Sequence, residues 1–342
     1  GAEYEALLGS GGVRPSLDLY YPTAAALPSR EGEREAALEH WASRRERRGR
    51  SVPFYGRSAE PVQTPSTRLT LELDEDRSRA LDRISRQKGF LSLSQELSRF
   101  SVFATLLVSW LHRVSGRADL GFDAPVAGRP TREAKRALGL FIEMFPFAVS
   151  VDPHETFRSL GARCLEEAKL KLLHAHPGMS SPTGATAGTG VLNYVPIQYS
   201  PFAGVPVEVE WVHPGHGDSV HALRLQVHDF SGSGGHTLHF DVNDTVLPER
   251  IRRRSLEHFE KVLDAFLDNP DRSIASVDVL VEDERRVLAS LNATDSEPLP
   301  DRSVVALFQV QAELEPDRVA LRQGPTELSF AELREQSESL AS

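Results

Sequence analysis

The feature that most constrains the fold is the succession of strand-like and helix-like segments between residues 66 and 267. Apolar and polar residues alternate over 66–73, whereas between Ser94 and Gly116 apolar residues recur at three- and four-residue spacing. Ser94 is typical of a helix N-cap and Gly116 of a helix end. Strands that alternate with long helices predict a two-layer α/β or α+β sandwich.

The same reading predicts the remaining elements. A run of Ser and Gly from Ser231 to Gly235 predicts a hairpin connection, and the Gly-, Ser-, Thr- and Pro-rich stretch 177–190 predicts a long loop. Helices are predicted over 33–47, 76–88, 155–174, 248–267 and 282–291, and strands over 119–126, 141–151, 191–197, 205–212, 221–230 and 236–242.

Composition limits the class of protein. The 342 residues carry a formal net charge of −10, which argues against a nucleic-acid partner, because phosphates require a basic face. The single cysteine, Cys164, excludes a disulfide framework and fits a reducing compartment; its helical context predicts a buried apolar role. No segment is long and apolar enough to predict a membrane span, so we expect a cytoplasmic protein with no membrane partner.

The last fifty residues carry four patterns in a fixed order. An Asn-Ala-Thr segment at Asn292 precedes a helical pattern, then Pro-Asp-Arg-Val-Ala-Leu over 316–321 and Leu-Ser-Phe-Ala-Glu-Leu over 328–333. This order resembles the junction between a condensation domain and an adenylation domain in nonribosomal peptide synthetases. The resemblance makes Leu328, Ser329, Phe330, Glu332 and Leu333 the first core motif of an adenylation domain.

Earlier segments resemble the C-terminal part of a condensation domain. They are Pro-Val-Ala-Gly-Arg-Pro over 125–130, Gly-Leu-Phe-Ile-Glu-Met-Phe-Pro over 139–146 and Val-Leu-Asn-Tyr over 191–194. Glu143 replaces the usual Asn, and Ala148 stands near the usual Arg, so any polar role of that strand is in doubt. The positions that define the structural motif are Gly128, Pro130, Gly139, Phe141 and Pro146.

The resemblance implies a fold like that of chloramphenicol acetyltransferase, mostly its C-terminal lobe. It implies a partial condensation domain over 1–285, a linker over 286–302 and a truncated adenylation start over 303–342. The implied reaction is amide formation between a carrier-bound acyl or peptidyl thioester and the amine of a second carrier-bound aminoacyl thioester. It belongs to multidomain enzymes of secondary-metabolite and antibiotic biosynthesis.

The implied partners are carrier proteins, the adjacent adenylation domain and the N-terminal lobe of the same condensation domain. The phosphopantetheine arm of the carriers would bring the substrates, and no cofactor is expected to bind directly. The family's catalytic motif, His-His-x-x-x-Asp-Gly, is absent from the 342 residues. We therefore expect the chain to begin just after the catalytic centre, to hold no catalytic residue and to be inactive by itself.

By resemblance Asn193, Tyr194 and Arg129 are candidates for lining the substrate tunnel. For Asn193 the alternative is a core amide with satisfied hydrogen bonds, and for Arg129 it is a turn residue. A metal site at His213 and His216 is disfavoured, because no second group of ligands completes it.

Two other functions remain open at this stage. A degenerate condensation-like domain could serve as a docking platform for partner proteins, which the changes at positions 143 and 148 would permit. A free-standing acyltransferase that uses a coenzyme A thioester is the other, and the adenylation-like tail argues against it.

Overall fold

The computed structural model divides the chain into two compact units, Gly1–Glu282 and Asp283–Ser342. Each unit is described by itself. Residues 1–30, Pro130 and the centre of the predicted 177–190 loop lie outside the described residues. The structure describes residues 31–47, 53–57, 65–129, 131–137, 139–177, 179–180, 189–199, 201–217, 220–230, 234–294 and 303–341.

A six-stranded mixed sheet forms the centre of the first unit, with strand order β1-β6-β5-β4-β2-β3. Strand β4 pairs in parallel with β5 and with β2, and the remaining neighbours are antiparallel. The strands are β1 (Ser66–Glu72), β2 (Asp119–Val126), β3 (Glu143–Ser150), β4 (Gly190–Val195), β5 (Leu223–His228) and β6 (Thr237–Asn243).

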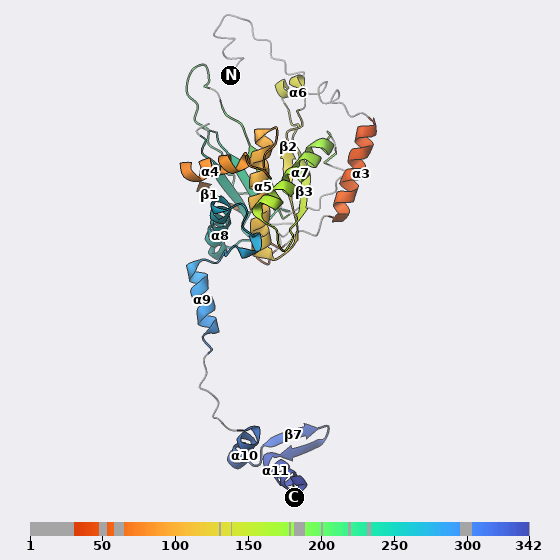
Figure 1. Cartoon of the computed structure of the whole chain (residues 1–342), viewed down its shortest axis with the longest axis vertical. Coiled ribbons are helices and arrows are strands. Elements are labelled where there is room, and N and C mark those ends of the chain that lie inside the picture. Colours follow the sequence, from red (N-terminus) through yellow and green to blue (C-terminus); the bar gives the residue numbers. More distant parts are fainter. Residues whose placement is uncertain are drawn as a thin grey trace, which may run out of the picture. The chain divides into compact units, whose positions relative to one another are not determined.

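Helices α4, α5, α7 and α8 pack on one another and on one face of this sheet, which makes the predicted two-layer arrangement (Figure 1). The helices of the unit are α3 (Glu31–Arg47), α4 (Glu75–Ser85), α5 (Gln95–Ser115), α6 (Arg132–Arg136), α7 (Phe157–His174) and α8 (Glu249–Asp268), with a 3₁₀ turn η2 (Ile274–Ser276).

Helix α5 is the central helix of the core, and its ends are those that the sequence predicts. The Ser94 side chain accepts a hydrogen bond from the Leu97 amide at 3.3 Å, and Gly116 ends the helix with φ +67°. Every residue from Ser101 to Leu111 is buried, because α5 has α4, α7, α8 and the sheet around it. Cys164 on α7 is fully buried, and burial raises the pKa of its thiol to about 12, so the predicted apolar role is confirmed.

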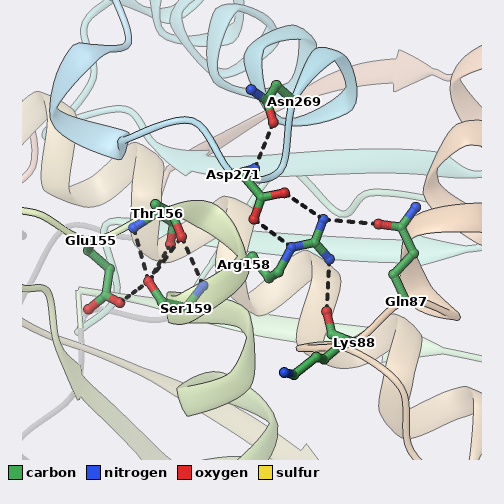
Figure 2. Close-up of polar contacts among 8 residues, drawn as sticks. All are labelled: Gln87, Lys88, Glu155, Thr156, Arg158, Ser159, Asn269 and Asp271. Atoms are coloured by element: carbon green, nitrogen blue, oxygen red, sulfur yellow. Dashed lines mark hydrogen bonds and ion pairs between the residues drawn. The ribbon is translucent and has the colours of Figure 1, made fainter.

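Helix α7 begins at a capping box that lies beside a three-way junction (Figure 2). The Thr156 and Ser159 side chains each accept a hydrogen bond from the other's backbone amide. Next to this box, the Arg158 guanidinium pairs with Asp271 at 2.6 Å and donates to the Lys88 carbonyl and to Gln87. Arg158 therefore joins the start of α7 to the α4–α5 connection and to the turn after α8.

The prediction of a strand over 205–212 is wrong. The segment makes only an isolated bridge between Phe202 and Val205, and residues 206–214 form no ladder. Val205 and Val212 are largely exposed, and prolines stand at 201, 206 and 214, where a ladder would need amide donors. Alternating residues form a strand only where a neighbouring strand supplies hydrogen-bonding partners.

The second unit is a small α/β structure that contains α9 (Glu282–Asn292) except for its first residue. After α9 come α10 (Val304–Leu314), an antiparallel hairpin of β7 (Val319–Gln323) and β8 (Thr326–Ser329), and α11 (Phe330–Ala341). The Phe308 and Phe330 rings lie 5.9 Å apart, and so join α10 to α11. Within the described part of the chain, every helix is too short or too polar to span a lipid bilayer.

Candidate functional site on strand β4

Strand β4 places two of the candidate site residues on opposite faces of the sheet. Because side chains alternate along a strand, Leu192 and Tyr194 point to the helical layer, where both belong to the main hydrophobic core. Asn193 points to the opposite face. The candidates therefore belong to two different environments.

On the face that carries Asn193, a chain of polar side chains crosses four strands. Asn193 Nδ2 donates to Gln226 Oε1 at 3.3 Å, and Gln226 Nε2 donates to Asp241 Oδ2 at 2.5 Å. Arg68 then holds both oxygens of Asp241, at 2.6 and 2.8 Å. Asn193 ends the chain, and its side-chain oxygen accepts no hydrogen bond from any described residue.

Asp241 remains ionised in this chain. Burial by itself raises the pKa of its carboxyl, but the hydrogen bonds from Arg68 and Gln226 outweigh burial, so the pKa lies below its usual range. The segment 205–217 adds to this arrangement, because Arg68 also donates to the Trp211 carbonyl. His213 donates to the Ser66 carbonyl at 3.0 Å, and its Nδ1 lies 3.5 Å from Asp241.

A pair of histidines lies on the same face of the sheet. The Nε2 atoms of His228 and His239 are 3.0 Å apart, so one donates and the other must accept. The His228 ring also stacks on Phe230 at 3.9 Å. Burial and the Arg68 charge lower the pKa of both imidazoles, and that of His239 falls to about 4. Both rings are therefore neutral at pH 7.

This pair predicts a pH dependence of stability. The pKa of His239 is about 6.5 in an unfolded chain and about 4 in the fold, so between these values the unfolded chain binds the extra proton. The free energy of unfolding therefore falls as pH decreases through this window, by about 1.5 kcal/mol after allowance for solvent screening. Protonation of Asp241 lowers the free energy of unfolding separately, below about pH 4.

Urea unfolding followed by tryptophan fluorescence measures this effect, because Trp41, Trp110 and Trp211 all belong to the first unit. His239→Gln is expected to remove part of the loss of unfolding free energy between pH 7 and pH 4.5, because His228 and His236, whose pKa values are also lowered, keep their contribution. His154→Gln, at an exposed position, should leave that loss unchanged. An unchanged pH profile in His239→Gln would contradict the assignment.

On the helical side, Tyr194 lines a cavity of about 240 Å³. The Tyr194 ring stacks on Phe103 with centroids 5.8 Å apart. The Arg99 guanidinium, which holds Asp82 at 2.9 Å, is the cation that acts on the Tyr194 hydroxyl. Burial raises the pKa of Tyr194, and Arg99 opposes part of that shift. Lys171 of α7 also lines this cavity, a residue that sequence reasoning missed because it occupies a place on the apolar stripe of the helix.

Arg129 lies in the loop after β2, away from the polar chain. Its guanidinium donates to the carbonyls of Ala134, Ala137 and Gly139 at 2.5, 2.6 and 2.8 Å, and lies 4.5 Å from the centre of the Phe141 ring. These contacts favour the turn-forming alternative, since the guanidinium already donates its hydrogen bonds to carbonyls of its own loop.

At two positions of the structural motif the backbone conformation requires glycine. Gly128 has φ +62°, and a Cβ there would lie 2.1 Å from the Phe141 carbonyl oxygen; Gly139 has φ +147°. Pro146 lies within β3 opposite Asp123, and Glu143 begins that strand and accepts a hydrogen bond from the Ser180 amide at 3.1 Å.

The candidate adenylation motif spans the end of a strand and the start of a helix in the second unit. Leu328 and Ser329 end β8, and α11 begins at Phe330. The Ser329 amide donates to Glu332 at 2.8 Å and the Glu332 amide donates to Ser329 Oγ at 3.2 Å, which is a capping box. Leu333 follows within α11. The motif is therefore a strand-to-helix junction.

The described residues contain no group of three or more His, Cys, Asp or Glu side chains placed to bind a metal ion. His216 instead forms an isolated bridge with Pro65.

Comparison with known proteins identifies relatives. Residues 24–183 match the family described as "Condensation domain". One of the linear gramicidin synthase subunits of Brevibacillus parabrevis is 26% identical over 285 residues, which cover 80% of this chain and 5% of that protein. Bacitracin synthase 1 of Bacillus licheniformis is 24% identical over 288 residues, with the same two shares. The chain spans about a twentieth of the length of these relatives.

Solved structures show the same fold. The first condensation domain of the calcium-dependent antibiotic synthetase superposes with a TM-score of 0.65 at 21% identity, over 82% of this chain and 62% of that one. A four-domain nonribosomal peptide synthetase bound to AMP and glycine gives 0.63 at 15% identity, over 98% of this chain and 27% of that one. The predicted fold class is confirmed.

Proposed function

We propose, from the premise that residues 24–183 belong to the condensation-domain family, that the first unit takes part in amide formation between two carrier-bound substrates. The donor is an acyl or peptidyl thioester and the acceptor is the amine of an aminoacyl thioester. The amine nitrogen bonds to the thioester carbonyl carbon, the carbon–sulfur bond breaks, and the thiol leaves with a proton. Both substrates would arrive on phosphopantetheine arms of carrier proteins.

The family match is the main support for this proposal. The chain of polar side chains that ends at Asn193 offers a candidate contact with the substrate. The Asn193 side chain is oriented through Gln226 by Asp241, which Arg68 fixes in turn. Its side-chain oxygen, which accepts no hydrogen bond from a described residue, suits an N–H of the acceptor amine. An oriented contact of this kind contributes by positioning the reacting groups.

The His-His-x-x-x-Asp-Gly motif is absent from the 342 residues, so proton handling requires a polypeptide that also carries that motif. In this proposal the first unit is mostly the C-terminal lobe of the condensation fold, and the motif belongs to the other lobe. Tyr194 contributes to the wall behind β4, and Arg129 shapes the loop after β2.

The second unit is proposed to be the start of an adenylation domain. In support, the similarity to the four-domain synthetase extends over 98% of this chain, and the capping box of Ser329 and Glu332 places the motif at a defined strand-to-helix turn. Its sequence contains no glycine-rich phosphate-binding motif, so adenylation by this unit alone is not expected.

The test is an assay of amide formation with two loaded carrier proteins. The 342 residues alone should give no product, and a polypeptide that combines them with the His-His-x-x-x-Asp-Gly motif should give product. In that polypeptide Asn193→Ala is expected to lower kcat about tenfold through loss of one hydrogen bond, or about 1.4 kcal/mol. Asn292→Ala, at an exposed position of α9, should leave kcat unchanged.

The outcomes separate the possible functions. Turnover by the 342 residues alone would contradict the need for the motif. Carrier-protein binding without any product from the combined polypeptide would favour the docking platform over the enzyme.

A further inference from the structure

Lys171 carries a buried amine that has no hydrogen-bonding partner among the described residues. It lies on the buried face of α7 with 4% of its surface exposed. Its Nζ lies 4.8 Å from the centre of the Phe100 ring, and it makes no hydrogen bond or ion pair with any described residue. Burying an amine without a hydrogen-bonding partner is costly, so an unpartnered one that lines a cavity indicates a ligand.

The cavity beside Lys171 is large enough for a small organic molecule. Its volume is about 240 Å³, and apolar cavities of about 150 Å³ accept benzene. Its walls are mostly apolar side chains of α5, α7, β2 and β4, among them Leu97, Phe100, Leu192 and Tyr194. Leu172, half exposed at its edge, leaves the cavity open to solvent.

The charges around Lys171 select a neutral ligand. Glu167 of α7 and Asp123 of β2 act on the amine, and Glu96 of α5 lines the cavity; Asp123 also pairs with His221 at 2.9 Å. Three carboxylates repel an anionic ligand. Burial outweighs the attraction of Glu167 and Asp123 for the ammonium form and lowers the pKa of Lys171 to about 7, so a large fraction is free amine at neutral pH.

We propose that this cavity binds a small, neutral, apolar aldehyde or ketone, which the Lys171 amine holds as an imine. The nitrogen lone pair attacks the carbonyl carbon, and the carbonyl oxygen takes up a proton from the nitrogen. The resulting carbinolamine then loses water to form the carbon–nitrogen double bond. Desolvation in an apolar pocket is a recognised way to activate a lysine for this reaction. The site is independent of the proposed condensation reaction.

Benzaldehyde is a suitable probe, since it is neutral, apolar and close in size to benzene. The 342-residue chain is treated with benzaldehyde and cyanoborohydride at about pH 7, and the reduced adducts are located by peptide mass spectrometry. Lys169 serves as an internal control, because it lies on the same helix, is 45% exposed and pairs with Glu166. Labelling of Lys171 is expected to exceed that of Lys169 at least about tenfold.

Two further measurements distinguish binding in the cavity from general reactivity. Benzyl alcohol, which fits the cavity but cannot form an imine, should reduce labelling of Lys171 and leave Lys169 unchanged. Lys171→Arg should abolish the dominant adduct, whereas Lys169→Arg should keep it. Labelling that follows exposure, with Lys169 above Lys171, would overturn the proposal, as would labelling of Lys171 that benzyl alcohol does not affect. The comparison of the two lysines in the unaltered chain requires no variant to fold.

Discussion

Replacing Trp110 by alanine is expected to lower the free energy of unfolding of the first unit by about 4 kcal/mol. Trp110 lies on α5 with 1% of its surface exposed. Its ring meets Phe54, Phe240 and Phe259 edge-on, with centroids 4.9, 5.9 and 5.4 Å away. The indole therefore joins the central helix to β6, to α8 and to the segment around Phe54. Urea unfolding followed by far-ultraviolet circular dichroism measures the loss.

Trp110→Phe is the matched control. The indole Nε1 of Trp110 is buried and has no hydrogen-bonding partner among the described residues, so phenylalanine removes an unsatisfied donor while it keeps most of the aromatic contacts. Its cost should stay below about 1.5 kcal/mol, because only part of the indole volume is removed and the unsatisfied donor is removed with it. A loss in Trp110→Ala no larger than that of the control would contradict the central position of this side chain.

Replacing Gly128 by alanine is expected to cost about 3 kcal/mol or more. Gly128 has φ +62°, and a Cβ at this position would lie 2.1 Å from the carbonyl oxygen of Phe141. That oxygen belongs to the backbone, so it cannot move aside as a flexible side chain would. The loop also holds the Arg129 contacts, which should loosen together with the backbone.

Gly116→Ala separates the steric contact from the backbone conformation. Gly116 has φ +67°, close to that of Gly128, but no heavy atom lies within 4 Å of its hypothetical Cβ. Its substitution should cost only about 1 kcal/mol, the penalty of the left-handed conformation itself. Equal losses in the two variants, measured by urea unfolding, would show that the Phe141 carbonyl moves away at little cost.

Local patterns predicted local structure well, because their physical causes lie within a few residues. The N-cap at Ser94 and the left-handed end at Gly116 depend only on neighbouring backbone groups, and both are as predicted. The prediction over 205–212 failed because a strand requires a partner that the pattern does not specify. The six confirmed strands all have such a partner.

The candidate site was predictable only in part. The resemblance selected Asn193 and Tyr194 from a single segment, and alternation along β4 already places them on opposite faces. Lys171 escaped notice because a lysine on an apolar stripe looks like a surface residue until its surroundings are known. Arg129 was open to two interpretations, and the carbonyls that it meets within its own loop favour the local one.

By itself, the order of residues determined the two-layer class, the ends of the main helices and the family resemblance, since these depend on periodicity and short motifs. Tertiary structure alone decided that Arg68 meets Asp241, 173 residues away, that His228 and His239 share one hydrogen bond, and that Lys171 opens into a cavity. The reason is that hydrogen bonds and burial depend on distance in space, and no local pattern records which distant segments a sheet brings together.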